Sequence, residues 1–190
     1  KPAERSGKGP RVLVLTPTRE LAMQVNDHIR QFSRYTKFKT GTLVGGSPYP
    51  PQIKMLRKTL DLLVATPGRL IDLMKQQQVN FSRLEILVLD EADRMLDMGF
   101  IDDIQFILDL TPDEKIMSLF SATMPTEILR LSEEYLKNPK QFLLDADDLS
   151  GEGIEQSYLV IKDRDKIKHL VDFIKENKKE IGRASCRERV

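Results

Sequence analysis

Short apolar runs recur along the chain, separated by stretches in which apolar residues have helical spacing. The runs are three to five residues long and nearly continuous, as is typical of strands buried on both faces of a parallel sheet. Between them, Leu21, Val25, Ile29 and Phe32 predict one face of a helix, and Ile128, Leu131 and Tyr135 predict another. Alternating strands and helices predict an α/β fold, a parallel sheet with helices on both faces. The predicted strands are Val12 to Leu15, Thr42 to Val44, Leu62 to Ala65, Ile86 to Leu89 and Ile116 to Phe120.

The remaining pattern predicts a domain boundary. A sixth strand is expected over 141–144, followed by an acidic segment, 145–153, in which two glycines indicate a linker. Residues 154–161 then alternate like a strand, and Ile167, Leu170, Val171 and Ile174 line one face of a helix. About 30 residues cannot enclose a core of their own, so we expect only the start of a second domain. The predicted segments are a polar lead-in at 1–10, a domain at 11–145, a linker at 146–153, a second domain starting at 154–180 and a separate tail at 181–190.

Composition narrows the class of protein. The 190 residues are 40% hydrophobic, and no apolar run approaches the ~20 residues that cross a bilayer, so we expect no membrane partner. One cysteine excludes a disulfide framework, and residues 1–10 have no apolar stretch that would direct secretion, so a cytoplasmic location is expected. Residues 1–80 carry 14 Lys or Arg and 5 Asp or Glu, whereas 81–180 carry 13 and 23. The first half is suited to attracting phosphates, although solvated surface would give the same asymmetry.

A short polar or glycine-bearing element follows each apolar run. Ligands of open parallel sheets bind beyond the carboxyl ends of the strands, so these elements are the candidate site. Any single one is equally well explained as a turn, because turns favour Gly, Pro, Ser and Asp for backbone reasons. The elements are Thr16-Pro17-Thr18-Arg19-Glu20, Gly45-Gly46, Thr66-Pro67-Gly68-Arg69, Asp90-Glu91-Ala92-Asp93 and Ser121-Ala122-Thr123.

Asp90 and Glu91 place two carboxylates at the tip of a buried strand. Ionised groups are costly there unless they are paired or metal-bound. We assign Asp90 to Mg²⁺, directly or through water, and Glu91 to activation of an attacking water, as in nucleotide-hydrolysing folds. Acids that favour a helix N-terminus for electrostatic reasons are the alternative.

Two arginines, Arg19 and Arg69, each begin a helix after a proline-containing turn. Backbone N–H groups and a guanidinium there could hold a phosphate. Gly45-Gly46 would allow a strand of nucleic acid to approach the backbone closely, without base reading. Either arginine could instead cap a helix or pair with a nearby acid.

Taken in order, these elements resemble the motifs of DEAD-box RNA helicases, over Arg11 to about Lys178. The resemblance implies RecA-like domains, ATP and Mg²⁺ as cofactors, and RNA as a partner bound through its sugar-phosphate backbone. It implies backbone contacts by Pro17, Thr18, Arg19, Gly45, Gly46, Thr66, Pro67, Gly68 and Arg69. It further implies that Asp93, Ser121, Ala122 and Thr123 couple the nucleotide site to unwinding when two domains close. The similar motifs are Pro17 to Ala22 (motif Ia), Gly45-Gly46 (the glycine doublet), Thr66 to Arg69 (motif Ib), Asp90 to Asp93 (motif II) and Ser121 to Thr123 (motif III).

Departures from the family pattern set further expectations. The family's Q motif and phosphate loop should precede Arg11, and Gly7-Lys8-Gly9 lacks the spacing of a phosphate loop. The arginine-rich motifs of the second domain are also missing, so we expect the parent protein to be an enzyme and this stretch to be inactive. Residues 94–100 resemble bacterial members. Residues 181–190 read as the translation of a sequencing adapter, and we expect them to carry no meaning.

Two other functions remain open. A related DNA helicase or translocase could use the same fold, although the Asp90-Glu91-Ala92-Asp93 spelling and motif Ia disfavour it. A weak RNA-binding or protein-docking module is the non-catalytic alternative. The sequence does not identify any ribonucleoprotein partner.

Overall fold

A computed structural model describes residues 9–143 and 166–176. The chain divides into two units, Lys1–Lys140 and Gln141–Val190. The described part of the first unit, from residue 9 onward, contains a sheet and six helices, and the described part of the second includes one helix, α7 (Lys166–Glu176). That helix confirms the helical prediction around 167–174, while the strand expected at 154–161 and the linker at 145–153 lie outside the described residues.

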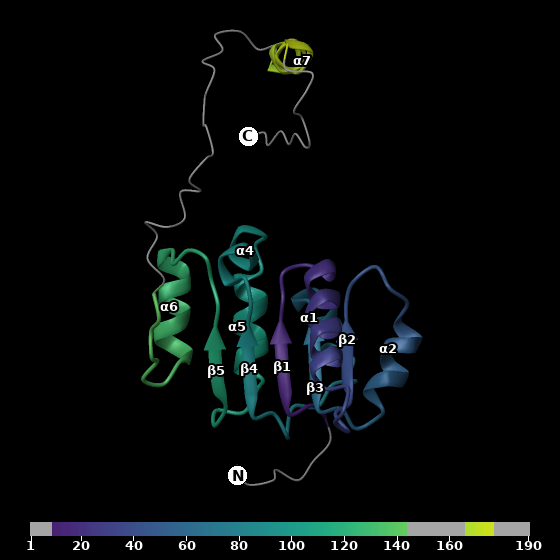
Figure 1. Cartoon of the computed structure of the whole chain (residues 1–190). Coiled ribbons are helices and arrows are strands. Elements are labelled where there is room, and N and C mark those ends of the chain that lie inside the picture. The colour runs from purple at the N-terminus through teal and green to yellow at the C-terminus, as the bar shows by residue number, and fades with distance from the viewer. Residues whose placement is uncertain (1–8, 144–165, 177–190) are drawn as a thin grey trace. The chain divides into compact units, whose positions relative to one another are not determined.

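Five parallel strands form one sheet in the first unit (Figure 1). Their order in space is β2-β3-β1-β4-β5, so β1 and β4 are adjacent although two strands separate them in sequence. The first residue of β1, Val12, lies opposite the first residues of both neighbouring strands, Leu62 and Ile86. The strands are β1 (Val12–Leu15), β2 (Thr40–Leu43), β3 (Leu62–Ala65), β4 (Ile86–Leu89) and β5 (Ile116–Leu119).

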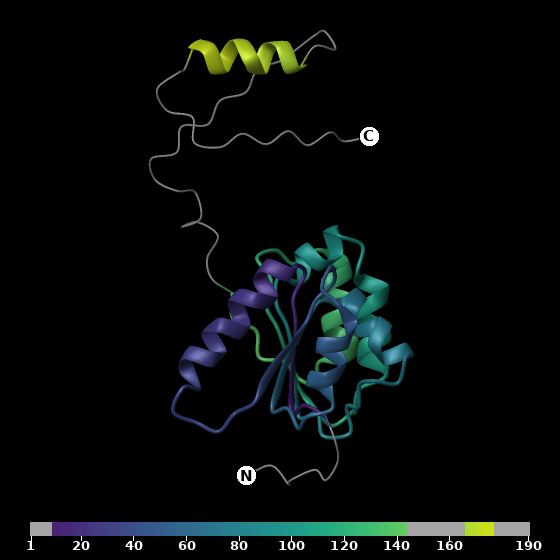
Figure 2. The same ribbon diagram turned by 90° about the vertical axis from the view of Figure 1, so that its right-hand side faces the viewer.

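Helices cover the two faces of the sheet unequally. Helix α1 (Arg19–Phe32) stands on one face, while the other helices of the first unit lie on the opposite side (Figure 2). These are α2 (Tyr49–Leu56), α3 (Pro67–Lys75), α4 (Ala92–Asp97), α5 (Ile101–Asp109) and α6 (Thr126–Tyr135). No helix in the described ranges is long and apolar enough to cross a membrane.

Successive strand residues point to opposite faces, which divides the apolar side chains into two clusters. The larger cluster packs strand residues such as Leu13, Leu63 and Leu87 against helices α3 to α6. The smaller one packs Val14 and Val64 against α1. The strands β1 and β3 are therefore buried on both faces, as their continuous apolar runs predict.

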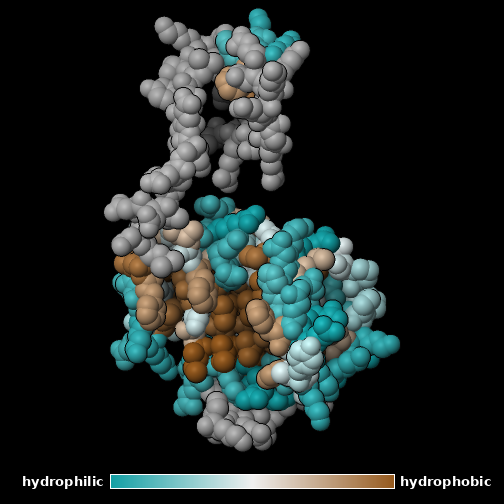
Figure 3. All heavy atoms as spheres, viewed as in Figure 1, coloured by the Kyte–Doolittle hydropathy of each residue, from teal (hydrophilic) through white to brown (hydrophobic). Residues whose placement is uncertain are grey.

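The prediction of burial on both faces is wrong for β5. Ile116 is 65% exposed and Phe120, just after the strand, is 59% exposed. The cause is that α1 covers only the β1 side of its face. Figure 3 shows the resulting hydrophobic area between α6 and α1. We call the solvent-exposed α1-side face of β4 and β5 the open face.

Two strand predictions differ from the structure in detail. The second strand begins at Thr40 and ends before Val44, because pairing with β3 extends it backward over polar residues. The sixth strand, expected at 141–144, is wrong for 141–143, which form no strand. Phe142 and Leu143 are 85% and 73% exposed, so nothing buries or pairs this apolar pair. Leu144 lies outside the described residues.

Candidate functional site

All five polar elements lie at the carboxyl edge of the sheet, because every strand runs in the same direction (Figure 1). Three of the elements begin with an amide that extends the pairing of their strand to a neighbour, and Phe120, just before motif III, does the same, so these elements lie side by side. These bonds run from Thr66 N to Leu43 O (3.0 Å), Thr16 N to Ala65 O (3.0 Å), Asp90 N to Leu15 O (3.0 Å) and Phe120 N to Leu89 O (2.8 Å).

The strand order sorts these elements into two groups. The glycine doublet, motif Ib and motif Ia follow β2, β3 and β1, which are neighbours on one side of the sheet. Motifs II and III follow β4 and β5 on the other side. The elements predicted to bind RNA are thus contiguous, and the predicted nucleotide-binding acids lie next to them.

Asp90 follows β4 directly and is half-buried. Burial raises the pKa of its carboxyl, and the adjacent Glu91 carboxylate raises it further, against a backbone hydrogen bond from Glu91 that lowers it. A carboxylate whose ionisation is disfavoured in this way would gain from a nearby cation.

Glu91 has a backbone conformation that residues other than glycine seldom adopt. Its φ and ψ are both 53°, in the left-handed region, and it forms the N-cap of α4. This conformation costs about 1–2 kcal/mol for an L-residue. Its Oε2 accepts a hydrogen bond from Arg94 Nη1 at 2.9 Å. Strain of this kind clusters at functional sites, and here it falls on the residue predicted to activate water.

The acid pair fits magnesium better than a metal held by protein ligands alone. Within the described ranges, no group of three or more His, Cys, Asp or Glu is placed to hold a metal ion. Mg²⁺ keeps several waters and is typically bound by one or two carboxylates together with substrate phosphates. Asp90 with Glu91 satisfies that requirement.

Asp93 joins motif II to motif III through a compact hydrogen-bond network. Its Oδ2 accepts from both the backbone N and the Oγ1 of Thr123, at 2.9 Å each. The N–H of Asp93 donates to Ser121 Oγ at 3.1 Å, and that hydroxyl donates to Thr123 O at 2.7 Å. Ala122, between them, is exposed. The three motif III residues predicted from sequence are thus brought together with Asp93.

The network also sets the charge of Asp93. Burial alone would raise the pKa of its carboxyl, but the hydrogen bonds from Thr123, Arg94 and Ser121 outweigh burial and lower it. Asp93 is therefore held ionised as the acceptor that anchors motif III. A further bond, from Ala92 N to Phe120 O at 3.0 Å, ties the two loops together and was not predicted.

Motif Ia begins α1. Pro17 is buried, and Thr18 is the N-cap, with its hydroxyl accepting from Leu21 N at 3.3 Å. Arg19 is exposed and lies against Gly46, where a Cβ would collide with the guanidinium. Gly46 has φ of 67°, a conformation that favours glycine, and a larger residue there would also have to displace the Arg19 guanidinium. Motif Ia and the glycine doublet therefore touch, as a continuous binding surface requires.

Motif Ib is connected to the same loop through Arg69. This side chain is 8% exposed, its Nη1 donates to Ser47 O at 2.8 Å, and its guanidinium stacks 4.0 Å from the centre of the Tyr49 ring. The guanidinium thus holds the loop at Ser47, a contact that neither of the two roles left open by the sequence describes. Sequence reasoning missed Ser47 and Tyr49, because the residues around them give no signal of a contact with Arg69.

The rest of motif Ib shares this arrangement. Thr66 and Pro67 are buried, Thr66 as the N-cap of α3, whereas Gly68 is exposed. A Cβ at Gly68 or at Gly45 would meet no atom within 4 Å. These two glycines present open backbone at the edge of the sheet.

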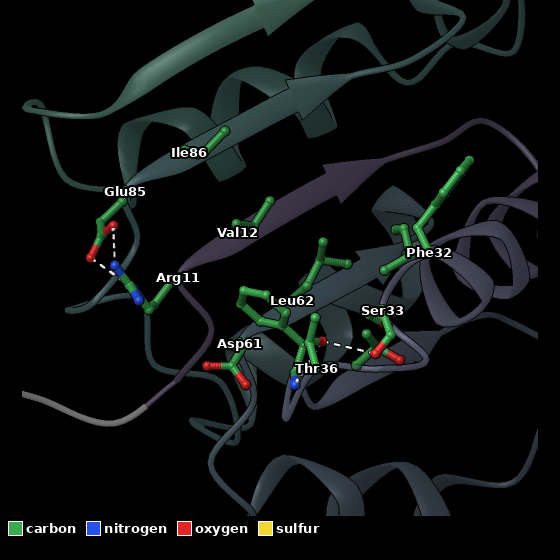
Figure 4. Close-up of a pocket in the computed structure, with 12 residues that line it drawn as sticks. Arg11, Val12, Phe32, Ser33, Thr36, Asp61, Leu62, Glu85 and Ile86 are labelled. Carbon is green, nitrogen blue, oxygen red and sulfur yellow. Dashed lines mark hydrogen bonds and ion pairs between the residues drawn. The ribbon is translucent and has the colours of Figure 1, made fainter. Parts of the chain in front are cut away.

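An apolar pocket of about 460 Å³ lies at the opposite, amino end of the strands. Figure 4 shows Val12, Leu62 and Ile86 in it, with Arg11 paired to Glu85 at its rim. Arg11 donates from Nε and Nη2 to the two Glu85 carboxylate oxygens, at 3.0 and 2.9 Å. The pocket adjoins the open face and takes no part in the predicted site.

Comparison with known proteins gives consistent results. The sequence model of the family described as DEAD/DEAH box helicase matches residues 2–131. A protein named DEAD-box ATP-dependent RNA helicase 20, from Arabidopsis thaliana, is 42% identical over 178 residues, covering 93% of this chain and 35% of the relative. The bacterial likeness is not borne out by this plant relative and stays a prediction.

Two crystal structures have the same fold. A DEAD box protein from the hyperthermophile Methanococcus jannaschii is 37% identical, with a TM-score of 0.70 over 89% of this chain and 45% of that one. A hypothetical ATP-dependent RNA helicase from Sulfolobus tokodaii is 48% identical, with a TM-score of 0.66 over 70% of this chain and 40% of that one. The predicted RecA-like fold is confirmed.

Proposed function

This chain belongs to the DEAD/DEAH box helicase family, and we propose that its parent protein is an ATP-dependent RNA helicase that couples Mg-ATP hydrolysis to local unwinding of RNA duplexes. The chain spans 35% of the length of its plant relative, so this activity is assigned to the whole protein. The fragment alone is proposed to be inactive.

One observation carries the proposal: a single side chain, Asp93, links the acid pair to motif III. The acids lie at the end of β4, and the Asp93 carboxylate holds Thr123, beyond β5, by two hydrogen bonds. A change at the nucleotide is thereby transmitted to the neighbouring loop without any long-range path. Coupling of hydrolysis to RNA rearrangement requires such a connection.

Hydrolysis is proposed to depend on Asp90 and Glu91. Asp90 would hold Mg²⁺, directly or through water, and the ion would neutralise charge that develops on the phosphates. Glu91 would orient the attacking water and accept its proton. Its exposed pair with Arg94 is weak enough, at about 0.2–1 kcal/mol, to release the carboxylate for this role.

RNA is proposed to lie along the contiguous elements beyond β2, β3 and β1. Arg19 offers a guanidinium for a phosphate, and the open backbone at Gly45 and Gly68 allows close approach. Arg69 would act indirectly, by holding the loop at Ser47. Contacts of this kind grip the sugar-phosphate backbone and read no bases, so binding is proposed to be independent of sequence.

The open face supports the view that other parts complete the domain. Parallel sheets are normally covered on both faces, yet Ile116 is 65% exposed. We propose that the phosphate loop and the second domain's motifs belong to the part of the family's length that this chain does not span. The proposed segment boundaries and the cytoplasmic location remain expectations from the sequence.

The test uses the full-length parent protein. ATP hydrolysis is measured without nucleic acid, with single-stranded RNA and with single-stranded DNA of the same sequence, alongside unwinding of a short RNA duplex. Stimulation by RNA but not by DNA, together with ATP-dependent unwinding, is expected. Equal stimulation by DNA would favour a DNA helicase or translocase, and hydrolysis without any nucleic-acid response would refute the proposal.

A further inference from the structure

The outer edge of β2 borders a wide groove between α1 and α2. β2 is the last strand of the described sheet on this side (Figure 1), and the groove has a volume of about 1240 Å³. Its lining includes five Lys or Arg and no Asp or Glu. We call these five cations the groove cations; they are Arg30, Arg34, Lys39, Arg57 and Lys58.

All of the groove cations are exposed, and none forms an ion pair within the described ranges. Cations near the carboxyl ends of helices are favourable in themselves, and Arg30 lies in the last turn of α1 while Arg57 caps α2. That rival explanation does not account for Lys39, which directly precedes β2. Unpaired positive charge concentrated in a concave surface attracts an anionic ligand.

Other lining residues match a polynucleotide. The hydroxyls of Thr40 and Thr42 can donate to phosphate oxygens, and Phe38, 60% exposed, offers a ring on which a base can stack. Asn26 also lines the groove, and its buried Oδ1 has no hydrogen-bond partner. Because protein atoms enclose that oxygen, the groups that a nucleic-acid strand can reach are the groove cations, the two threonine hydroxyls and the Phe38 ring.

An acidic peptide added as a further strand fits this edge less well. The side chain of Gln52 already occupies the edge at Val44, accepting from its N–H and donating to its C=O, each at 3.2 Å. Only Thr40 and Thr42 remain for pairing along β2, which is too short for a stable added strand.

The groove is continuous with the proposed RNA surface. Gly45 and Gly46 follow β2 at its carboxyl end, and Lys39 precedes it at the other end. At about 3.3 Å per strand residue, the two ends are separated by roughly 20 Å. A single strand that leaves the glycine doublet can therefore enter the groove within a few nucleotides.

We propose that this groove binds a single-stranded extension of the RNA held at motifs Ia, Ib and the glycine doublet. The inference rests on the proposed function, since it needs RNA at those motifs. It adds a second contact region on the side of the domain, which would favour substrates with an unpaired tail next to the duplex.

The experiment compares two four-charge variants of the full-length protein. The groove variant is Arg34→Gln, Lys39→Gln, Arg57→Gln and Lys58→Gln. The matched control removes four exposed cations elsewhere, as Lys75→Gln, Arg130→Gln, Lys137→Gln and Lys140→Gln. Binding is measured by fluorescence anisotropy over a range of salt, with a minimal oligouridine and with one about ten nucleotides longer.

The groove variant is expected to lose the extra affinity of the longer RNA, roughly tenfold, while binding the short RNA as the wild type does. Because each phosphate contact to a single strand contributes about 0.7 to the salt slope, the slope for the long RNA should fall by about 2 to 3. The control variant should keep both the affinity and the slope.

Three results would overturn the proposal. The groove variant could retain the long-RNA advantage and its slope. It could lose affinity for both RNAs as much as the control does, which would indicate general electrostatics, or it could lose only thermal stability, which would indicate helix-dipole compensation. Short-RNA binding and RNA-stimulated hydrolysis that persist in these cases leave the proposed function intact, whereas their absence in the wild type would refute both.

Discussion

Adding one methyl group to Gly46 is expected to destabilise the protein, although the same change at the neighbouring Gly45 is not. At Gly46, φ is 67°, and a Cβ would collide with the Arg19 guanidinium. At Gly45, no positive φ occurs and a Cβ would meet no atom within 4 Å. The two substitutions have the same effect on the unfolded chain, so any difference in stability between them arises in the folded state.

The magnitude follows from two opposing effects. Replacing Gly by Ala reduces the entropy of the unfolded chain and stabilises by about 0.4–1 kcal/mol at a compatible position, as expected for Gly45→Ala. At Gly46 the left-handed conformation costs about 1–2 kcal/mol, which offsets or exceeds that gain, and Arg19 must also move. Gly46→Ala should be less stable than Gly45→Ala by about 1–2 kcal/mol.

Thermal and urea unfolding of the two full-length variants measure this difference. RNA affinity is the second readout, since a displaced Arg19 should weaken binding by about tenfold for the loss of one charged hydrogen bond. If Gly46→Ala unfolds at the same point as Gly45→Ala and binds RNA as the wild type does, the contact between motif Ia and the glycine doublet has no energetic consequence and the reasoning fails.

Three further outcomes are expected in the full-length protein. Glu91→Gly should be more stable than Glu91→Ala by about 1 kcal/mol in urea unfolding, because only glycine relieves the left-handed strain, and equal stability would argue against that strain. Because folding lowers the pKa of Asp93, its stabilisation is complete above the ordinary value of 3.8 and is lost as the pH falls through the lower folded value. Unfolding followed from pH 6 to pH 2 should therefore show a steeper acid loss in the wild type than in Asp93→Asn, and parallel curves would contradict this. Ile116→Asp should cost about 3 kcal/mol or more if other parts of the protein cover the open face, whereas Leu110→Asp, also at an exposed position, should change stability by less than about 0.5 kcal/mol; equal effects in melting experiments would mean that the face stays exposed.

The sequence predicted most of the sheet because its signal is local. Continuous apolar runs at β1 and β3 coincide with strands buried on both faces, and the run at β4 coincides with a strand that is buried on one face and half-buried on the other. β2 was misplaced because its first residues are polar and become a strand only by pairing with β3, a contact distant in sequence. The expected strand failed at 141–143 for the converse reason, since its apolar residues have no strand partner in the described part of the chain.

The candidate site was predictable to the level of its elements but not of its contacts. Parallel strands bring their carboxyl ends to one edge whatever the order, so the sequence sufficed to group the motifs there. The strand order, the bonds from Asp93 to Thr123 and the burial of Arg69 against Tyr49 depend on packing between segments far apart. The roles of the individual site residues remain proposals.

ATP hydrolysis by the full-length protein, with and without single-stranded RNA, examines the role of the acid pair through two matched variants. Glu91→Gln removes the carboxylate proposed to activate water, and Glu133→Gln makes the same change at an exposed position of α6. We expect RNA-stimulated hydrolysis to fall by about 10²- to 10⁴-fold in Glu91→Gln and to persist in Glu133→Gln. Hydrolysis that is undiminished in Glu91→Gln, or absent from the wild-type protein with RNA, would contradict the account.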